Sequence, residues 1–234
     1  MNVLISCESG GDGIPDGWSQ PVPPRLAGDS SARFAAESIA RLSSAPLVIN
    51  RYSPELIDVS RSIRHRQLFS PQTRGWPSAD RQRLIEQVYH PYRRNLTDRI
   101  RQLQKASGFV IHVSVSSFPA IQNGRHVRTD AGLLYDPSRQ DEVDFCLDWI
   151  DWMYEEVLDF RVRRNHPRRG TSGGMMRTLR QEFQEENYLG IELALNRAWV
   201  SRPVAARDRV LEGIACCLDA VLAFEIIEAV KSAA

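Results

Sequence analysis

The sequence predicts an α/β protein, a three-layer αβα sandwich with a mixed, largely parallel sheet. Short apolar segments alternate with amphipathic ones along the chain, which is typical of a sheet covered by helices on both faces. A chain of 234 residues suits one domain of this kind. Because neither an internal repeat nor a linker interrupts the alternation, we expect a single domain that spans residues 1–234.

The expected strands are short and mostly apolar. They lie at residues 2–7, 45–50, 56–62, 108–115, 131–135, 160–165 and 188–195. Helices are expected from about residue 30 to 42 and at 78–105, 139–160, 175–186 and 203–231. Asp29, Ser30 or Ser31 can cap the first of them. Pro91 should kink or break the second, because proline cannot donate the backbone hydrogen bond of a helix interior.

Composition and charge exclude several classes of protein. Apolar residues make up 42% of the chain and charged residues 25%, as in ordinary globular proteins. A net charge of +1 argues against nucleic acid as a partner, since phosphate binding needs a cationic surplus. The most apolar stretch, 214–230, is interrupted by Asp219, Glu225 and Glu228, so no membrane span is expected. The N-terminus lacks the pattern of a signal peptide, and a cytoplasmic location is therefore expected.

The four cysteines show no metal-ligand spacing. Cys7, Cys146, Cys216 and Cys217 form no Cys-x-x-Cys pair, and the adjacent Cys216 and Cys217 fall within a predicted helix. We therefore expect all four to be buried thiols. His112 lies in the clearest predicted strand and is interpreted as a hydrogen-bonded core histidine.

Polar residues follow several of the expected strands. In open α/β sheets, ligands bind beyond the carboxyl ends of the strands. The sequence therefore predicts a cleft lined by the side chains that follow strands or lie within the last one, namely Glu8, Ser9, Asp12, Arg61, Ser116, Arg169 and Glu192.

Seven segments resemble, in the same order, the N-formylglutamate amidohydrolase family. They are Leu4 to Gly11 with Ile14-Pro15, Leu56 to Ser62, His90 to Arg93, Val113 to Phe118, Arg128 to Pro137, Asn165 to Gly170 and Tyr188 to Leu193. The resemblance covers residues 4 to about 197. It implies a fold like that of zinc carboxypeptidases and the hydrolysis of an amide in a small N-acyl amino acid, with zinc, a general base and arginines that bind a carboxylate.

Two positions depart from the family's pattern. Where the family has Glu-His-Gly-Gly this chain has Glu8-Ser9-Gly10-Gly11, and where the family has Val-His-Ser-Phe it has Val115-Ser116-Ser117-Phe118. Ser9 and Ser116 therefore stand at the histidine positions of the family's metal site, and Asp12 stands where a third ligand is expected. Neutral hydroxyls are poor zinc ligands, so we expect zinc to be absent or weakly bound.

The resemblance also assigns roles to the remaining site residues, each with a structural alternative. Glu192 is either the general base or the partner of a structural ion pair. Arg61 and Arg169 either bind a substrate carboxylate or pair with Asp58 or Asp130. Arg128 is expected to bind substrate or, more simply, to brace Asp130, which lies two residues away.

Three functions remain open at this level. The first is an N-formylglutamate amidohydrolase-like hydrolase whose activity is lost or weakened at the serine positions. The second is a metal-free relative that binds a small carboxylate or a protein partner, and the third is a structural or interaction domain. The expected ligand is a small N-acyl amino acid or dicarboxylate, whereas the sequence leaves the oligomeric state open.

Overall fold

A six-stranded sheet forms the centre of the protein. The computed structural model describes residues 2–18, 22, 26–172 and 174–232. In the sheet the strand order is β2-β1-β3-β8-β6-β7. The strands are β1 (Val3–Cys7), β2 (Leu47–Ile49), β3 (Val110–Phe118), β6 (Ala131–Leu134), β7 (Val162–Arg164) and β8 (Tyr188–Asn196). The first four strands of that order are mutually parallel, while β6 and β7 run antiparallel to β8. The predicted mixed, largely parallel sheet is confirmed.

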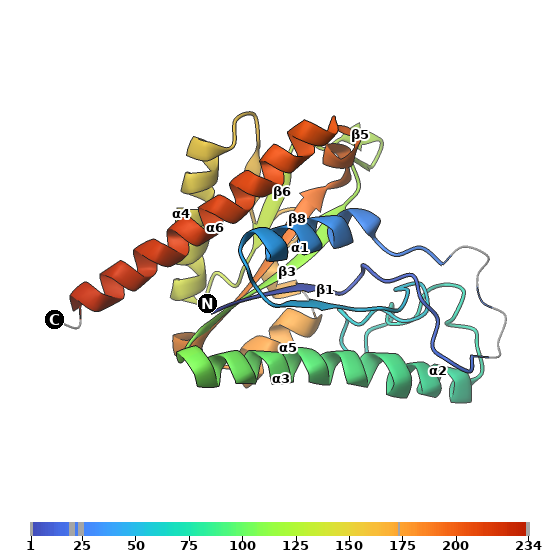
Figure 1. Ribbon diagram of the computed structural model, residues 1–234. Coiled ribbons are helices and arrows are strands. Elements are labelled where there is room, and N and C mark those ends of the chain that lie inside the picture. Colours follow the sequence, from blue (N-terminus) through green and yellow to red (C-terminus); the bar gives the residue numbers. More distant parts are fainter. Residues whose placement is uncertain (1, 19–21, 23–25, 173, 233–234) are drawn as a thin grey trace.

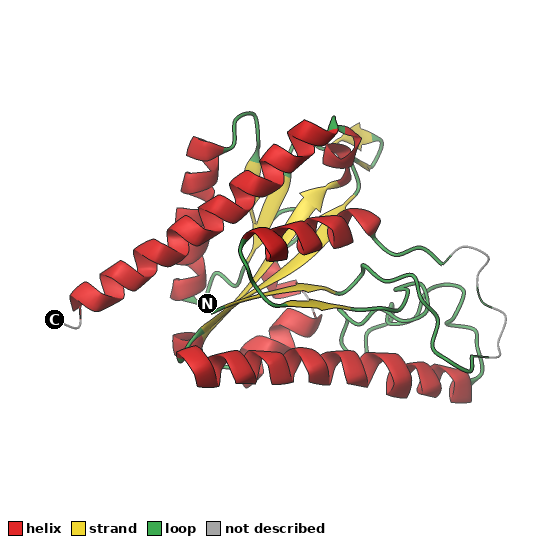
Figure 2. Cartoon of the chain, viewed as in Figure 1, coloured by secondary structure: helices red, strands yellow, loops and turns green. Residues whose placement is uncertain are grey.

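Helices cover both faces of this sheet, as predicted (Figure 1, Figure 2). They are α1 (Ser30–Leu42), α2 (Ser78–Leu84), α3 (His90–Ser107), α4 (Gln140–Glu156), α5 (Gly174–Glu182) and α6 (Val204–Ser232). Helices α1, α4 and α6 pack on one face, and α3 and α5 on the other. Among the described residues, no helix combines the length and apolar character that a membrane crossing requires.

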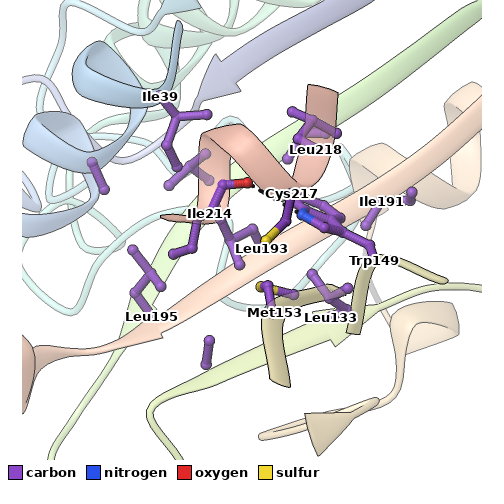
Figure 3. Packing of buried hydrophobic residues seen from close by; sticks show 14 of the residues in the cluster. Ile39, Leu133, Trp149, Met153, Ile191, Leu193, Leu195, Ile214, Cys217 and Leu218 are labelled. Carbon is purple, nitrogen blue, oxygen red and sulfur yellow. Dashed lines mark hydrogen bonds between the residues drawn. The ribbon is translucent and has the colours of Figure 1, made fainter. Parts of the chain in front are cut away.

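Two apolar clusters hold the layers together. On the α1, α4 and α6 side, Trp149 is fully buried against Leu193 and Cys217 of the same cluster, and its indole Nε1 donates to the Ile214 carbonyl at 3.3 Å (Figure 3). The second cluster lies between the sheet and α3 and α5. Truncating a buried residue of Trp149's size to alanine typically costs about 3–5 kcal/mol, so these clusters dominate the stability of the fold.

The segment at residues 56–62 is not the strand that its pattern predicts. It forms successive turns instead, because Asp58 Oδ1 accepts hydrogen bonds from the backbone N–H of Ser60 at 3.0 Å and from its hydroxyl at 2.6 Å. Such a side-chain-to-backbone bond offers the chain an alternative to pairing in a sheet. The loop that follows β3 contains a small hairpin, β4 (Ile121–Gln122) and β5 (Arg125–His126), which the sequence analysis missed. Positive φ angles at Asn123 and Gly124 form its turn.

The helical region expected at 78–105 is not broken at Pro91. A π-helical segment, Ile85–Tyr89, joins α2 directly to α3, and the residues at both junctions keep right-handed helical backbone angles. Pro91 follows this segment, so the irregularity of the helix lies just before the proline. The expectation of four buried thiols is wrong for Cys216, which is exposed, whereas the other three are buried. Helix α6 turns this position away from the core while its neighbour Cys217 faces inward.

Candidate functional site

A cavity of about 710 Å³ lies beyond the carboxyl end of β1, beside the central and carboxyl-terminal residues of β3 and β8. Because the neighbouring parallel strands β3 and β8 continue past the end of β1, their side chains border the space beyond that end. Glu8 and Ser9 come from the end of β1, Ser114 and Ser116 from β3, and Glu192 from β8. The first residues of α1 and the turns at 54–61 form the other walls.

Glycines allow the loops to pack closely beyond the end of β1. A Cβ atom on Gly11 would lie 2.4 Å from the carbonyl oxygen of Asn50, and one on Gly28 would lie 2.3 Å from the carbonyl oxygen of Gly11. The loop after β1 is therefore held between two other segments, and any side chain at these positions would force them apart. This packing fixes the positions of Glu8 and Ser9.

Both oxygens of the Glu192 carboxylate are engaged. Ser116 donates its hydroxyl to Oε1 at 2.7 Å, and the guanidinium of Arg168 pairs with Oε2. Glu192 is buried in β8, opposite Ser114 of β3 in the sheet register. A carboxylate in such a place requires a partner, and here it has two. The serine at the family's histidine position thus acts as a hydrogen-bond donor to Glu192.

Glu8 is the centre of a second, more deeply buried network. Its carboxylate accepts hydroxyl hydrogen bonds from Ser6 at 2.7 Å, Tyr92 at 2.7 Å and Ser114 at 2.5 Å. Burial raises the pKa of Glu8, an effect that these three hydroxyls partly offset and that the nearby Glu192 charge reinforces. The carboxyl group is therefore held rigidly at the wall of the cavity.

His112 extends this network away from the cavity. Its Nε2 lies 2.8 Å from the Ser6 hydroxyl and its Nδ1 lies 2.9 Å from the Tyr188 hydroxyl. Burial lowers the pKa of His112 to about 3, so the imidazole is neutral at physiological pH. The interpretation of His112 as a hydrogen-bonded core histidine is confirmed.

Two further arginines reach the cavity, and both are paired. Arg61 Nε lies 3.0 Å from Asp58 Oδ2. Arg197 lies 3.3 Å from Asp29, which also accepts a 2.5 Å hydrogen bond from Ser117 and caps α1 through the backbone N–H of residue 32. The predicted alternative for Arg61, an ion pair with Asp58, is therefore present, although Arg61 still lines the cavity.

The predicted cleft holds most of the expected residues but not all of them. Glu8, Ser9, Arg61, Ser116 and Glu192 line the cavity. The other three site candidates are exposed side chains that do not line it, namely Asp12, Arg128 and Arg169.

The chain geometry explains these three departures. Asp12 follows the enclosed glycines and lies near Arg33 of α1, whose pKa is raised mainly by its ion pair with Glu37 and to a smaller extent by the charge of Asp12. Arg168, the neighbour of Arg169, reaches Glu192 in its place. The expected brace between Arg128 and Asp130 is wrong, because Asp130 pairs with Arg202 at 2.6 Å.

Sequence reasoning missed Arg168, Asp29 and Arg197 as cavity residues. Arg168 is the neighbour of the predicted Arg169, and the sequence does not show which of the two side chains points into the cavity. Asp29 is one of three residues that the sequence offers as a cap of the first helix, and its contact with Ser117 depends on the packing of α1 against β3. Arg197 gave no signal, because it follows the last strand without any motif of its own.

Comparison with known proteins identifies the family. The family model for N-formylglutamate amidohydrolase matches residues 1–200. This chain belongs to the N-formylglutamate amidohydrolase family. Two solved structures have similar folds. A gene product of Agrobacterium tumefaciens is 21% identical, with a TM-score of 0.75 over 95% of this chain and 90% of that one. N-formylglutamate amidohydrolase from Ralstonia eutropha JMP134 is 18% identical, with a TM-score of 0.65 over 94% and 92%. A search of curated proteins finds no significant match.

The side chains of this family member do not fit the zinc site that the family resemblance implies. A catalytic zinc normally takes three protein ligands, mostly imidazoles and carboxylates. In the part of the chain that the structure describes, no group of three His, Cys, Asp or Glu side chains is arranged to hold a metal ion. At the expected ligand positions are the hydroxyls of Ser9 and Ser116 and the outward-facing Asp12. The donor set is too weak and too dispersed for zinc.

Proposed function

We propose that this family member binds a small carboxylate ligand, of the N-acyl amino acid type, without hydrolysing it. The observation that supports this proposal is the hydrogen bond from Ser116 to Glu192, at the place where the family resemblance implies a zinc-bound imidazole. Ser116, at the position where the resemblance implies a metal ligand, is thus bonded to Glu192, at the position where it implies the general base. Arg168 pairs with the same carboxylate. A fold shared with hydrolases does not by itself establish their activity.

The chemistry of amide hydrolysis explains why activity should be lost. In zinc hydrolases the metal lowers the pKa of bound water to about 7, far below that of bulk water. Without a metal the water keeps its bulk acidity, and the Glu192 carboxylate, which Ser116 and Arg168 hold in place, is too weak a base to generate hydroxide by itself. On this proposal the protein retains a cavity that can bind a ligand, but it lacks an activated water molecule to attack the amide.

Ligand binding should depend on Arg61. Only its Nε is bonded within the described residues, to Asp58, so its terminal amino groups remain available to a ligand carboxylate. A charge-assisted contact of this kind contributes about 1.5–3 kcal/mol. Arg168, in turn, should bind ligand less well because Glu192 already holds it.

Three measurements on the purified protein test the proposal. Zinc content after incubation with the metal should be well below one per chain, N-formylglutamate should release no formate, and calorimetry with N-formyl amino acids should show binding that Arg61→Ala weakens at least tenfold. Arg128→Ala is the matched control, since Arg128 is exposed and lies outside the cavity. Stoichiometric zinc with zinc-dependent formate release would show that the protein is an active hydrolase.

A gain-of-function variant tests whether the serines at positions 9 and 116 are the reason for weak zinc binding. The double change Ser9→His and Ser116→His supplies two imidazoles and should raise zinc affinity above that of the parent protein, although Asp12 faces away from the cavity and the hydrogen-bond partners that orient such imidazoles are missing. Zinc uptake by this variant, with none by the parent protein, would place the defect at these two positions. Equal uptake by both proteins would contradict the proposed loss.

A further inference from the structure

The charges that line the cavity do not balance. Among the residues that the structure describes, five carboxyl groups face three guanidinium groups. The acidic residues are Glu8, Asp29, Glu55, Asp58 and Glu192, and the basic residues are Arg61, Arg168 and Arg197. A cavity with an anionic surplus attracts cations and disfavours ligands with more than one negative charge.

The arginines do not reverse this surplus, because each has a carboxylate of the protein beside it. Arg61 pairs with Asp58, Arg168 with Glu192, and Arg197 with Asp29. These three pairs leave Glu8 and Glu55. Glu8 is enclosed by three hydroxyl donors, and omitting it from the balance still leaves one carboxylate in excess.

Glu55 is that remaining carboxylate. Its backbone N–H donates to the Ser53 hydroxyl at 3.1 Å, which fixes the start of the turns at 54–61. Its half-buried side chain lines the cavity and makes no hydrogen bond or ion pair with any residue that the structure describes. Glu55 belongs to the same wall as Arg61, which lies six residues further along the chain. A carboxylate without a partner among the described residues and a guanidinium with only its Nε bonded there therefore border the same space.

We infer that the ligand carries a cationic group, an ammonium or guanidinium, in addition to its carboxylate. This inference rests on the proposed function, which supplies the carboxylate and its contact with Arg61. The Glu55 carboxylate then pairs with the cationic group of the ligand, and the Arg61 guanidinium pairs with the ligand carboxylate. A dicarboxylate such as N-formylglutamate would instead place its second negative charge in a cavity that already has an anionic surplus.

Three N-formyl amino acids with the same main chain test the inference by calorimetry on the intact protein. N-formylarginine carries a cationic side chain, N-formylglutamine a neutral one and N-formylglutamate an anionic one. N-formylarginine should bind about ten- to a hundredfold more tightly than N-formylglutamine, which is the range expected of one charge-assisted contact. N-formylglutamate should bind most weakly, and raising the salt concentration should reduce the differences.

The variant Glu55→Gln identifies the residue responsible. It should abolish the preference for N-formylarginine over N-formylglutamine while leaving the affinity for N-formylglutamine within about twofold. Glu155→Gln, which alters an exposed carboxylate of α4 outside the cavity, should change neither value.

The possible outcomes separate the two hypotheses. Tightest binding of N-formylglutamate, equal binding of all three ligands, or an unchanged preference in Glu55→Gln would overturn the inference and leave the proposed function standing. Binding of none of the three ligands would overturn the proposed function and the inference together.

Discussion

A buried carboxylate that holds β8 in place offers a sharp test of the structure. Glu142 of α4 is fully buried, and its Oε1 accepts hydrogen bonds from Arg180 Nε at 2.9 Å and from the Gly190 backbone N–H at 3.1 Å. Arg139 lies 3.5 Å from the same oxygen, and the Asp136 N–H donates to Oε2 at 2.8 Å. Glu142 thereby ties α4 and α5 to the strand that carries the Glu192 carboxylate.

The expected cost of removing this charge follows from the burial of its partners. The side chains of Arg139 and Arg180 are only 9% and 6% exposed, so Glu142→Gln leaves two guanidinium groups with little solvent and no counterion from this position. Breaking a buried ion pair by removing one partner costs about 3–5 kcal/mol. For a chain of this size that corresponds to a fall in melting temperature of about 6–20 °C.

Thermal and urea unfolding, followed by circular dichroism, measure this cost. The matched control is Glu37→Gln on α1, because Glu37 also pairs with an arginine at 2.9 Å, but in that pair Arg33 and Glu37 are 47% and 45% exposed. An exposed pair of this kind contributes at most about 1 kcal/mol. If the two variants lost similar stability, or if Glu142→Gln lost less than about 1 kcal/mol, the argument from burial would be refuted.

Three further predictions concern the cap, the core histidine and the thiols. Asp29→Ala should be about 1 kcal/mol less stable than Asp29→Ser in urea unfolding, because serine still caps α1 while both variants lose the contacts with Ser117 and Arg197; equal losses would contradict the capping role. Because the pKa of His112 is depressed from 6.5 to about 3 in the folded protein, the unfolded chain binds the proton first, and stability should fall as the pH drops from 6.5 towards 3. His112→Asn, compared with the parent protein at pH 7 and pH 4.5, should show a smaller fall, and an unchanged fall would exclude His112 as its source. A thiol reagent should label one cysteine of the native protein rapidly, and Cys216→Ser should abolish that labelling, since burial raises the pKa of the Cys7 thiol to about 12; rapid labelling of Cys7 would contradict this structure.

The sequence by itself determined the layers of the fold and most of the cavity. Apolar segments such as those around Val113 and Ile191 alternate with amphipathic ones. The apolar segments are strands of a sheet that helices bury on both faces, and the amphipathic segments are those helices. Ser9, Ser116 and Glu192 could be placed near one another because Ser9 follows one strand of a largely parallel sheet and the other two lie on or next to further strands of it, although Ser116 and Glu192 lie within β3 and β8 and not at their ends. Local pattern and strand direction were sufficient for these conclusions.

Only the tertiary structure decided which charged groups meet. The direction of an exposed side chain beyond a strand depends on loop packing, so the sequence could not choose between Arg168 and Arg169, nor foresee that enclosed glycines leave Asp12 outside the cavity. It also could not reveal that Asp58 would turn its segment away from a strand conformation or that Glu55 would remain without a partner among the described residues. Secondary structure follows from local preferences, whereas the pairing of charges in the cavity depends on contacts between residues far apart in the chain, as Asp29 and Arg197 are.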